Sequence, residues 1–213
     1  MRRRRPSPSR RLVFRCPPAV VVVLALTVLA TLAALAAVVA AGCGGGGTAT
    51  GVEHYANAEY RFSLDVDRRL TQWRTATAAS GAAFEVSFVD AAVTAAGGRH
   101  PDALTVSVVD TGTTPTSEEA AQLAALLAKL AAAMVARMGP DAQAGTVSNV
   151  TLNGRSGVVV PFAATVAGVR QVGWLYLLVA GGHIYALTAA ATADQWDTYQ
   201  PLFTSAIDSF RVG

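Results

Sequence analysis

A run of 23 uncharged residues, from Ala19 to Ala41, constrains this chain of 213 residues more than any other feature. Only Thr27 and Thr31 interrupt its apolar character, and the first 42 residues hold seven arginines but no aspartate or glutamate. A basic stretch, a long apolar stretch and then small residues form the layout of an export signal. We therefore predict that residues 1–42 are a signal segment and that the folded domain follows it.

The residues that end this segment resemble the processing site of a bacterial lipoprotein. Ala40, Ala41 and Gly42 are small enough to let a peptidase approach the backbone closely, although Ala40 stands where such sites usually carry leucine, and Cys43 follows. The resemblance implies cleavage between Gly42 and Cys43 and a diacylglyceryl group on the Cys43 thiol. Two acyl chains give lasting anchorage, and the Gly-rich residues 43–51 would form a flexible tether to the domain.

An uncleaved transmembrane anchor is the alternative to a processed lipoprotein. At about 1.5 Å per residue, a helix of 23 residues spans the roughly 30 Å hydrocarbon core of a bilayer. Both interpretations keep the arginines in the cytoplasm and place the domain on the outer side of the cell membrane. Ser9–Arg15 also resembles a twin-arginine export motif, so the general secretory route and the twin-arginine route both remain open.

The basic character of the chain belongs to this N-terminal segment alone. The whole chain has a formal net charge of +3, whereas the part from Cys43 onward has ten lysines and arginines against 14 aspartates and glutamates, a net charge of −4. A nucleic-acid-binding domain would carry its basic patch on the folded part, so that class is excluded. Cys16 and Cys43 are too few for a disulfide framework or a thiolate metal site, and we expect neither metal nor cofactor.

After the tether come segments in which apolar and polar residues alternate, as in half-buried strands. They are residues 60–66, 84–89 and 104–109. A capping box formed by Thr116 and Glu119 then predicts an amphipathic helix from about Pro115 to Met138. Its apolar face is formed by Leu123, Leu126, Leu127, Leu130 and Met134.

Three turn signals predict an antiparallel meander after this helix. The turns are Asn153-Gly154, Ala167-Gly168 and Gly181-Gly182, and the strands that they separate are about 145–152, 155–166, 169–180 and 183–191. The last turn sets the register of the last strand pair, because a two-residue turn fixes which residues face one another. The expected pairs are Ala180 with His183, Leu178 with Tyr185, and Tyr176 with Leu187.

The last helix is predicted to begin at Asp194, which we assign as its N-cap, and to end at about Ser209. Its buried face would carry Trp196, Tyr199, Phe203 and Ile207. Strands, one long helix, an antiparallel meander and a C-terminal helix together predict an α+β fold.

In this order the elements resemble the PsbP-like family of exported bacterial proteins. The resemblance covers about residues 52–213 and lies in Tyr55–Leu64, Trp73, the mid-chain helix and the closing Ser209-Phe210-Arg211, although residues 67–70 lack the proline usual before the tryptophan. It implies an α/β/α sandwich, with an antiparallel sheet of about six or seven strands between helices. It also implies a non-catalytic binding or assembly function. A mycobacterial-type envelope lipoprotein of the same general fold is a looser comparison.

No arrangement of residues in the sequence supports catalysis or metal binding. The three histidines, His54, His100 and His183, have no second histidine or cysteine at metal-ligand spacing, and we interpret them as surface or turn residues. Asp65 and Asp67 share one side of a strand and could serve acid–base chemistry or bind a cation, but a solvated strand face is the simpler interpretation. Without a nucleophile and its base, we predict that the protein is not an enzyme.

Two functions remain open. In the first, the lipid-anchored domain docks to a protein or another component of the cell envelope. In the second, it carries a lipid or another small apolar ligand between sheet and helix. The aromatic residues Trp174, Tyr176, Tyr185 and Trp196 either line that pocket or pack in the core. A large apolar pocket would favour the carrier, and a closed core with an exposed apolar patch would favour docking.

Overall fold

The computed structural model describes residues 51–73, 82–93, 101–111 and 117–213, with only the backbone of residues 117–122. Residues 1–50 lie outside these ranges, and with them the predicted signal segment, its cleavage site and Cys43. His100 and the capping residue Thr116 also lie outside the described residues. None of the helices in the described part is both long and apolar enough to cross a membrane.

The described chain forms eleven strands and two helices. Their bounds are β1 (Val52–Asn57), β2 (Phe62–Asp67), β3 (Thr71–Trp73), β4 (Phe84–Val89), β5 (Ala103–Asp110), α2 (Ser117–Val135), β6 (Gln143–Ala144), β7 (Ser148–Leu152), β8 (Arg155–Val166), β9 (Val169–Ala180), β10 (His183–Thr192), α3 (Trp196–Ser209) and β11 (Arg211–Val212).

The strands form two antiparallel sheets. The small sheet has the order β1-β2-β11, and the large sheet has the order β3-β4-β5-β10-β9-β8-β6, with β7 also paired to β8. The predicted α+β fold with an antiparallel sheet is thereby confirmed. The large sheet has eight strands instead of six or seven, because β3 and β6 are only three and two residues long and carry no readable alternation.

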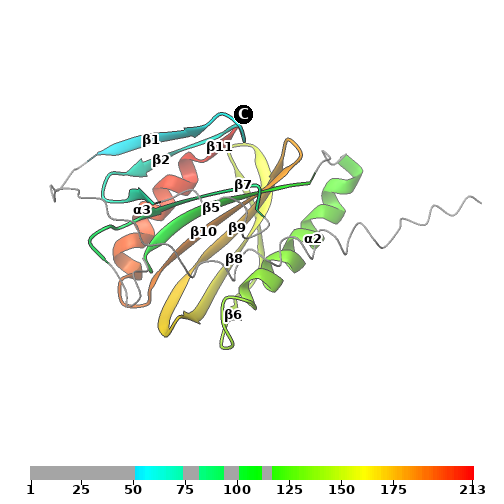
Figure 1. Ribbon diagram of the computed structural model, residues 1–213. Coiled ribbons are helices and arrows are strands. Elements are labelled where there is room, and N and C mark those ends of the chain that lie inside the picture. Colours follow the sequence, from blue (N-terminus) through cyan, green and yellow to red (C-terminus); the bar gives the residue numbers. More distant parts are fainter. Residues whose placement is uncertain (1–50, 74–81, 94–100, 112–116) are drawn as a thin grey trace, which may run out of the picture.

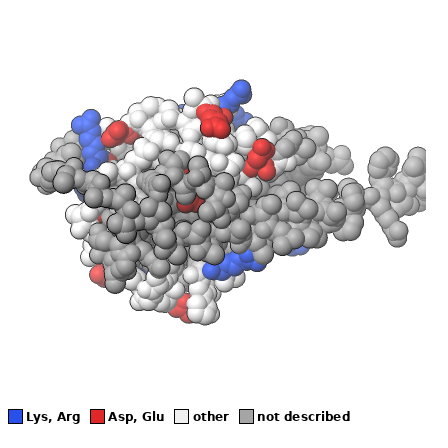
Figure 2. Space-filling view, viewed as in Figure 1, with Lys and Arg blue, Asp and Glu red and all other residues white. Residues whose placement is uncertain are grey.

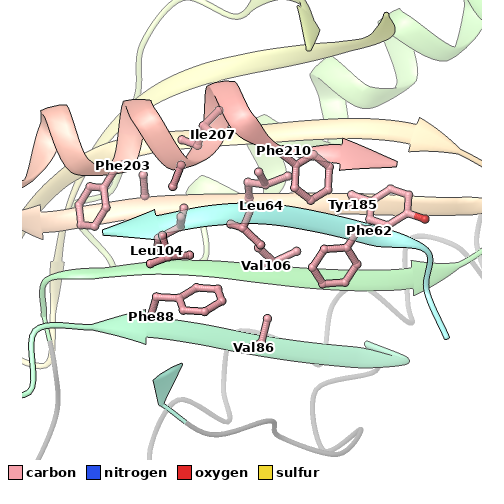
Figure 3. Packing of buried hydrophobic residues seen from close by; sticks show 14 of the residues in the cluster. Phe62, Leu64, Val86, Phe88, Leu104, Val106, Tyr185, Phe203, Ile207 and Phe210 are labelled. Atoms are coloured by element: carbon pink, nitrogen blue, oxygen red, sulfur yellow. The ribbon is translucent and has the colours of Figure 1, made fainter. Parts of the chain in front are cut away.

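The large sheet is the middle layer of the domain (Figure 1). α2 lies against one of its faces, over β8 and β9. α3 and β2 lie against the other face, and Figure 3 shows them packed over β10, β5 and β4. Helices therefore cover both sides of the sheet, and the small sheet shares one outer layer with α3.

Both residues of each hairpin turn have the positive φ that a primed two-residue turn requires. The φ angles are 46° and 81° at Asn153 and Gly154, 53° and 83° at Ala167 and Gly168, and 58° and 82° at Gly181 and Gly182. The predicted register of the last pair is confirmed, with Ala180 opposite His183 and Tyr176 opposite Leu187. β8 and β9 also begin and end at the predicted residues.

The start of α3 differs from the prediction. Gln195, not Asp194, is its N-cap, and no side chain caps that end. The chain enters the helix through a turn in which the Gln195 amide donates a 2.9 Å hydrogen bond to the Thr192 carbonyl oxygen. Asp194 belongs to this turn and lies one residue before the N-cap position. Three of the four predicted core residues of α3 are buried, and Trp196 is half-buried.

The buried face of α2 is rotated from the leucine stripe that the sequence suggests. Leu127, Ala131 and Val135 are buried and lie about one helical turn apart, whereas Leu126 is 41% exposed. The half-buried apolar neighbours are Leu123, Leu130 and Met134. The helix therefore meets the sheet through Leu127, Ala131 and Val135.

Two hydrophobic cores result, one on each face of the large sheet. The core under α3 and β2 is rich in aromatic side chains, including Phe62, Tyr185, Phe203 and Phe210 (Figure 3). The core under α2 is smaller and mostly aliphatic. α2 makes its main contacts with β8 and β9, and the core beneath it also takes in residues of β10 and the end of β5.

Candidate binding cavity

A cavity lies where α2 stops covering the large sheet. Its volume is about 130 Å³, and the strands β4, β5, β10, β9 and β8 contribute to its wall. Strand residues two apart point to the same face, so alternate residues of each strand reach the cavity. The apolar side is formed by Leu130, Met134 and Met138 from α2 and the turn after it, and by Phe162, Leu177 and Ile184 from the sheet.

The strands β4 and β5 give the cavity a polar side. Glu85 and Ser107 are direct cross-strand partners, and the Ser107 hydroxyl donates a hydrogen bond of 3.0 Å to Glu85 Oε2. Thr105 lines the cavity two residues before Ser107, and its hydroxyl oxygen lies 2.8 Å from that of its partner Ser87. Thr188, opposite Thr105 on β10, continues the polar row. A ligand in the cavity therefore meets an apolar side and a polar side.

Glu85 is the one charged residue among the described residues that line the cavity. Burial raises the pKa of the Glu85 carboxyl, and the hydrogen bond from Ser107 opposes that rise with a smaller effect. The carboxyl group therefore gives up its proton less readily than a glutamate in water. A positive charge placed beside it would favour the ionised form.

The aromatic residues that the sequence offered as a pocket lining lie on the opposite face of the sheet. Trp174 packs edge-to-face on Trp196 of α3, with ring centroids 5.0 Å apart, and Tyr176 is half-buried against the same core. Tyr185 is fully buried there, and its hydroxyl donates a 2.8 Å hydrogen bond to the Tyr60 carbonyl oxygen. Core packing is the correct interpretation, because alternate residues of β9 and β10 point away from the cavity.

Asp65 and Asp67 do not act as a pair. Asp65 Oδ1 lies 2.7 Å from Nδ1 of His54 on the neighbouring strand β1, and both side chains are exposed. Asp67 accepts two hydrogen bonds of 2.9 Å from the Arg69 guanidinium, which hold the pKa of that carboxyl below its usual value. Each carboxylate thus has its own basic partner. This agrees with a solvated face of the strand and not with a pair of carboxylates that acts in acid–base chemistry.

His183 lies directly after the Gly181-Gly182 turn, as predicted. Its Nδ1 atom is buried, has no hydrogen-bond partner among the described residues and lies 4.0 Å from Asp110 Oδ1. The rings of Tyr60 and Tyr185 meet the imidazole edge-on, with centroids 5.7 and 6.1 Å away. In the part of the chain that the structure describes, no group of three or more histidine, cysteine, aspartate or glutamate residues is arranged to hold a metal ion.

A second group of polar residues, near the start of α3, was not expected from the sequence. Asp102 is only 1% exposed, and its Oδ1 atom accepts a 2.7 Å hydrogen bond from the Thr192 amide. Burial raises the pKa of Asp102. The Tyr199 hydroxyl donates a 2.6 Å hydrogen bond to Asp90 Oδ2, and burial together with this bond raises the pKa of Tyr199 strongly. The first bond joins the start of β5 to the end of β10, and the second joins α3 to the residue after β4, so both have a structural role.

The polar residues of the cavity are the candidates that sequence reasoning missed. The alternation of β4 does place Glu85 and Ser87 on one face, opposite Val86 and Phe88, so a signal for them exists. That signal is ambiguous, because a polar face of a strand usually meets water. Only the position of α2 beside this face turns it into the wall of a cavity.

No protein-family model and no curated protein sequence matches this chain. The solution structure of cyanobacterial PsbP (CyanoP) from Synechocystis sp. PCC 6803 is similar, with a TM-score of 0.55 and 16% identity over 81% of this chain and 98% of that chain. The crystal structure of LpqN, involved in cell envelope biogenesis of Mycobacterium tuberculosis, has a TM-score of 0.51 and 12% identity over 76% of this chain and 91% of that chain. At such identities the likeness concerns the fold alone. The fold of this domain is PsbP-like.

Proposed function

We propose that this protein is a lipid-anchored binding protein on the outer side of the cell membrane, and that its domain holds a small apolar ligand without catalysing a reaction. The observation that carries the proposal is the cavity of about 130 Å³ between α2 and the large sheet. Concave sites with an apolar wall and a few polar groups are the usual form of small-molecule sites. Of the two functions that the sequence left open, this proposal is the second, in which the domain carries a small apolar ligand.

The size of the cavity limits the ligand. An engineered cavity of about 150 Å³ lined by aliphatic and aromatic side chains binds benzene, whereas pockets for drug-sized ligands begin at about 300 Å³. The cavity here, at about 130 Å³, therefore fits one aromatic ring or a short alkyl group. A whole lipid is too large, so a lipid would enter with the end of one acyl chain.

Docking to a protein partner has less support, because the described surface carries no large apolar patch. Its exposed large hydrophobic residues are Val52 and Leu126, which are 57% and 41% exposed and lie on β1 and α2. Isolated apolar residues of this kind are normal on protein surfaces. Among the coloured residues of Figure 2, basic and acidic side chains are scattered singly, so the described part of that face offers no field of one sign to a charged partner.

The membrane anchor in this proposal rests on Cys43. Gly42 and Cys43 directly follow the apolar run, and residues 43–51 are rich in glycine, as a flexible tether would be. A lipid on Cys43 would hold the protein at the membrane while the tether leaves the domain free to meet its ligand. The fold that the domain shares with LpqN, a protein involved in cell envelope biogenesis, supports the same compartment.

Two methionines in the cavity wall make a direct binding test possible. The chain holds three methionines, of which Met134 and Met138 line the cavity. Isotope-labelled methionine methyl groups are observed by NMR in the full chain, held in lipid nanodiscs. Benzyl alcohol, whose ring matches the cavity, should shift both signals in a saturable way. Shifts that do not saturate would contradict the proposal.

A matched pair of alanine variants locates the binding site. Ala186 lines the cavity on β10, whereas Ala133 lies on the exposed side of α2. Ala186→Leu should fill the cavity and weaken the binding of benzyl alcohol about tenfold or more. Ala133→Leu adds the same atoms at a distance from the cavity and should leave binding unchanged. An equal loss in both variants would place the ligand elsewhere.

Mass spectrometry tests the anchor. The N-terminal peptide of the wild-type protein should begin at Cys43 and carry a diacylglyceryl mass. Cys43→Ser removes the thiol, so the precursor should remain unprocessed and migrate more slowly on a gel. A plain transmembrane anchor predicts the full-length chain in both proteins. Intact residues 1–18 in wild-type protein purified from membranes would contradict the lipoprotein and leave the outer placement standing.

A further inference from the structure

We infer that the ligand is a small amine, with an aromatic or alkyl group on the apolar side of the cavity and a protonated nitrogen against the Glu85 carboxylate. This inference rests on the proposed function and narrows it to one chemical class. It follows from the distribution of charged and polar groups around the cavity, whereas the proposed function follows from the cavity itself.

The cavity presents two chemically different sides to a ligand. Met134 and Leu177 belong to the apolar side, and Glu85, Ser107 and Thr105 stand next to one another on β4 and β5. A ligand that fills the apolar side with a ring or an alkyl group brings its remaining end to the polar side. That end must satisfy the carboxyl group, because polar groups removed from water need a hydrogen-bond partner.

Glu85 decides the chemistry of that polar end. Within the described chain its carboxylate accepts the 3.0 Å hydrogen bond from Ser107, and no lysine, arginine or histidine among the described residues lines the cavity. A carboxylate withdrawn from water is best stabilised by a charged donor, since charge-assisted hydrogen bonds are roughly twice as strong as neutral ones. The raised pKa of Glu85 agrees with the lack of such a donor among the described residues of the cavity wall. A protonated amine supplies it.

The same arrangement argues against anionic ligands. A fatty acid or a phosphate ester would bring its negative charge beside Glu85, and the described wall holds no basic side chain to receive that charge. Like charges at short range disfavour binding. A neutral alcohol can use the hydroxyl groups of Ser107 and Thr105 but leaves the carboxylate without a cation. The expected order of affinity is therefore amine, then alcohol, then carboxylate.

Three ligands of one size test this order: benzylamine, benzyl alcohol and benzoate. They carry the same ring and differ in the charge of one polar group. Their dissociation constants are measured at neutral pH with the full chain in nanodiscs of uncharged lipid, from the methyl signals of Met134 and Met138. Benzylamine should bind about tenfold more tightly than benzyl alcohol, and benzoate should give no saturable shift.

Glu85→Gln is the decisive variant, because it keeps the length and one oxygen of the side chain and removes the charge. It should abolish the preference for benzylamine over benzyl alcohol. Methyl signals of Met134 and Met138 at their wild-type positions in the ligand-free variant show that it is folded. Glu53→Gln removes a charge from the exposed strand β1 and is the matched control. It should keep the wild-type preference.

The outcomes separate this inference from the proposed function. If benzyl alcohol binds and benzylamine binds no better, the amine inference is wrong and the binding function stands. If none of the three ligands shifts the methionine signals, both are wrong. A preference for the amine that survives Glu85→Gln places the cation elsewhere and also overturns the inference. The wild-type series alone decides the order of affinities if Glu85→Gln does not fold.

Discussion

The two faces of the large sheet are packed in different ways. On the face under α3 and β2, aromatic rings fill the space. Phe62 lies near Phe210 and Tyr185 (Figure 3), and its ring centroid is 5.7 and 6.1 Å from theirs. Tyr199 stacks on Phe203 with a centroid distance of 5.9 Å. On the face under α2, small and aliphatic side chains make the contact and leave a cavity of about 130 Å³ beside the helix.

The difference follows from the size of the side chains on the two faces. α2 is rich in alanine, and Ala186 and Ala190 of β10 face the cavity that it borders. Large aromatic rings fill the first face, whereas small alanine side chains on the strands leave a gap beside α2 on the second. A densely packed interior is more stable than one that contains a cavity. We therefore expect one face to stabilise the domain and the other to serve binding.

The largest effect should come from opening the aromatic core. Phe203 is fully buried, so Phe203→Ala should lower the free energy of unfolding by about 3–5 kcal/mol. Leu130 is half-buried beside the cavity, so Leu130→Ala should lower it by only about 1–2 kcal/mol. Urea unfolding of the full chain, followed by tryptophan fluorescence, measures both. Equal losses would contradict the difference between the faces.

The same substitution can be made on both faces of β10. Ala189 faces the aromatic core and Ala186 faces the cavity, and both are buried. Ala189→Leu should destabilise the domain by about 1–3 kcal/mol, because the closed core has no room for the added atoms. Ala186→Leu should be neutral or stabilise it by up to about 1 kcal/mol, because it fills the cavity. Thermal unfolding measures both variants. A larger loss of stability in Ala186→Leu than in Ala189→Leu would contradict the difference between the two faces.

The buried carboxyls, one on each face, predict a smaller and pH-dependent effect. Burial raises the pKa of Asp102 from 3.8 and that of Glu85 from 4.5. Between the ordinary and the raised pKa, the folded state binds a proton that the unfolded state has released. The stability contributed by these groups is therefore fully present below the ordinary pKa and is lost as the pH rises through the folded pKa.

Asp102→Asn tests this dependence on the aromatic side. It should raise the free energy of unfolding near neutral pH, because it removes a buried charge, and change it little near pH 4. Urea unfolding at several pH values measures the slope, with Glu53→Gln on the exposed strand β1 as the control. Among the described residues, hydrogen bonds lower the pKa of Asp67, Asp141 and Asp194. The stability that these three carboxylates contribute is lost as the pH falls through their folded pKa. A slope that Asp102→Asn leaves unchanged would contradict the assignment.

The smallest effect is expected away from both faces, on the small sheet. His54 and Asp65 lie 2.7 Å apart, but both side chains are exposed. Exposed ion pairs contribute little, so His54→Ala should change the free energy of unfolding by less than about 0.5 kcal/mol. Thermal unfolding at neutral pH and at pH 5 gives the measurement. A larger loss would mean that the small sheet depends on this pair.

Much of the fold could be predicted because its signals are local. The turn at Gly181-Gly182 and the alternation around it predict both the existence and the register of the β9–β10 pair. The same reasoning failed at Asp194, where the helix begins one residue later than the capping pattern indicates. It also failed at Leu126, which belongs to a leucine stripe in the sequence but is exposed, since the contact with the sheet runs through Ala131.

The sequence by itself determined the hairpins, the two helices and the division of each strand into two faces, because neighbouring residues settle turns and alternation. The tertiary structure alone decided that β11 closes the small sheet, with Arg211 opposite Ser63, and that α2 rests on β8 and β9. It also decided that the polar face of β4 and β5 borders a cavity and not bulk water. Alternation places Glu85 and Ser107 on a common side, but side-chain volumes in elements far apart along the chain determine where α2 comes to rest. That position places the carboxyl group in the wall of a cavity instead of in water.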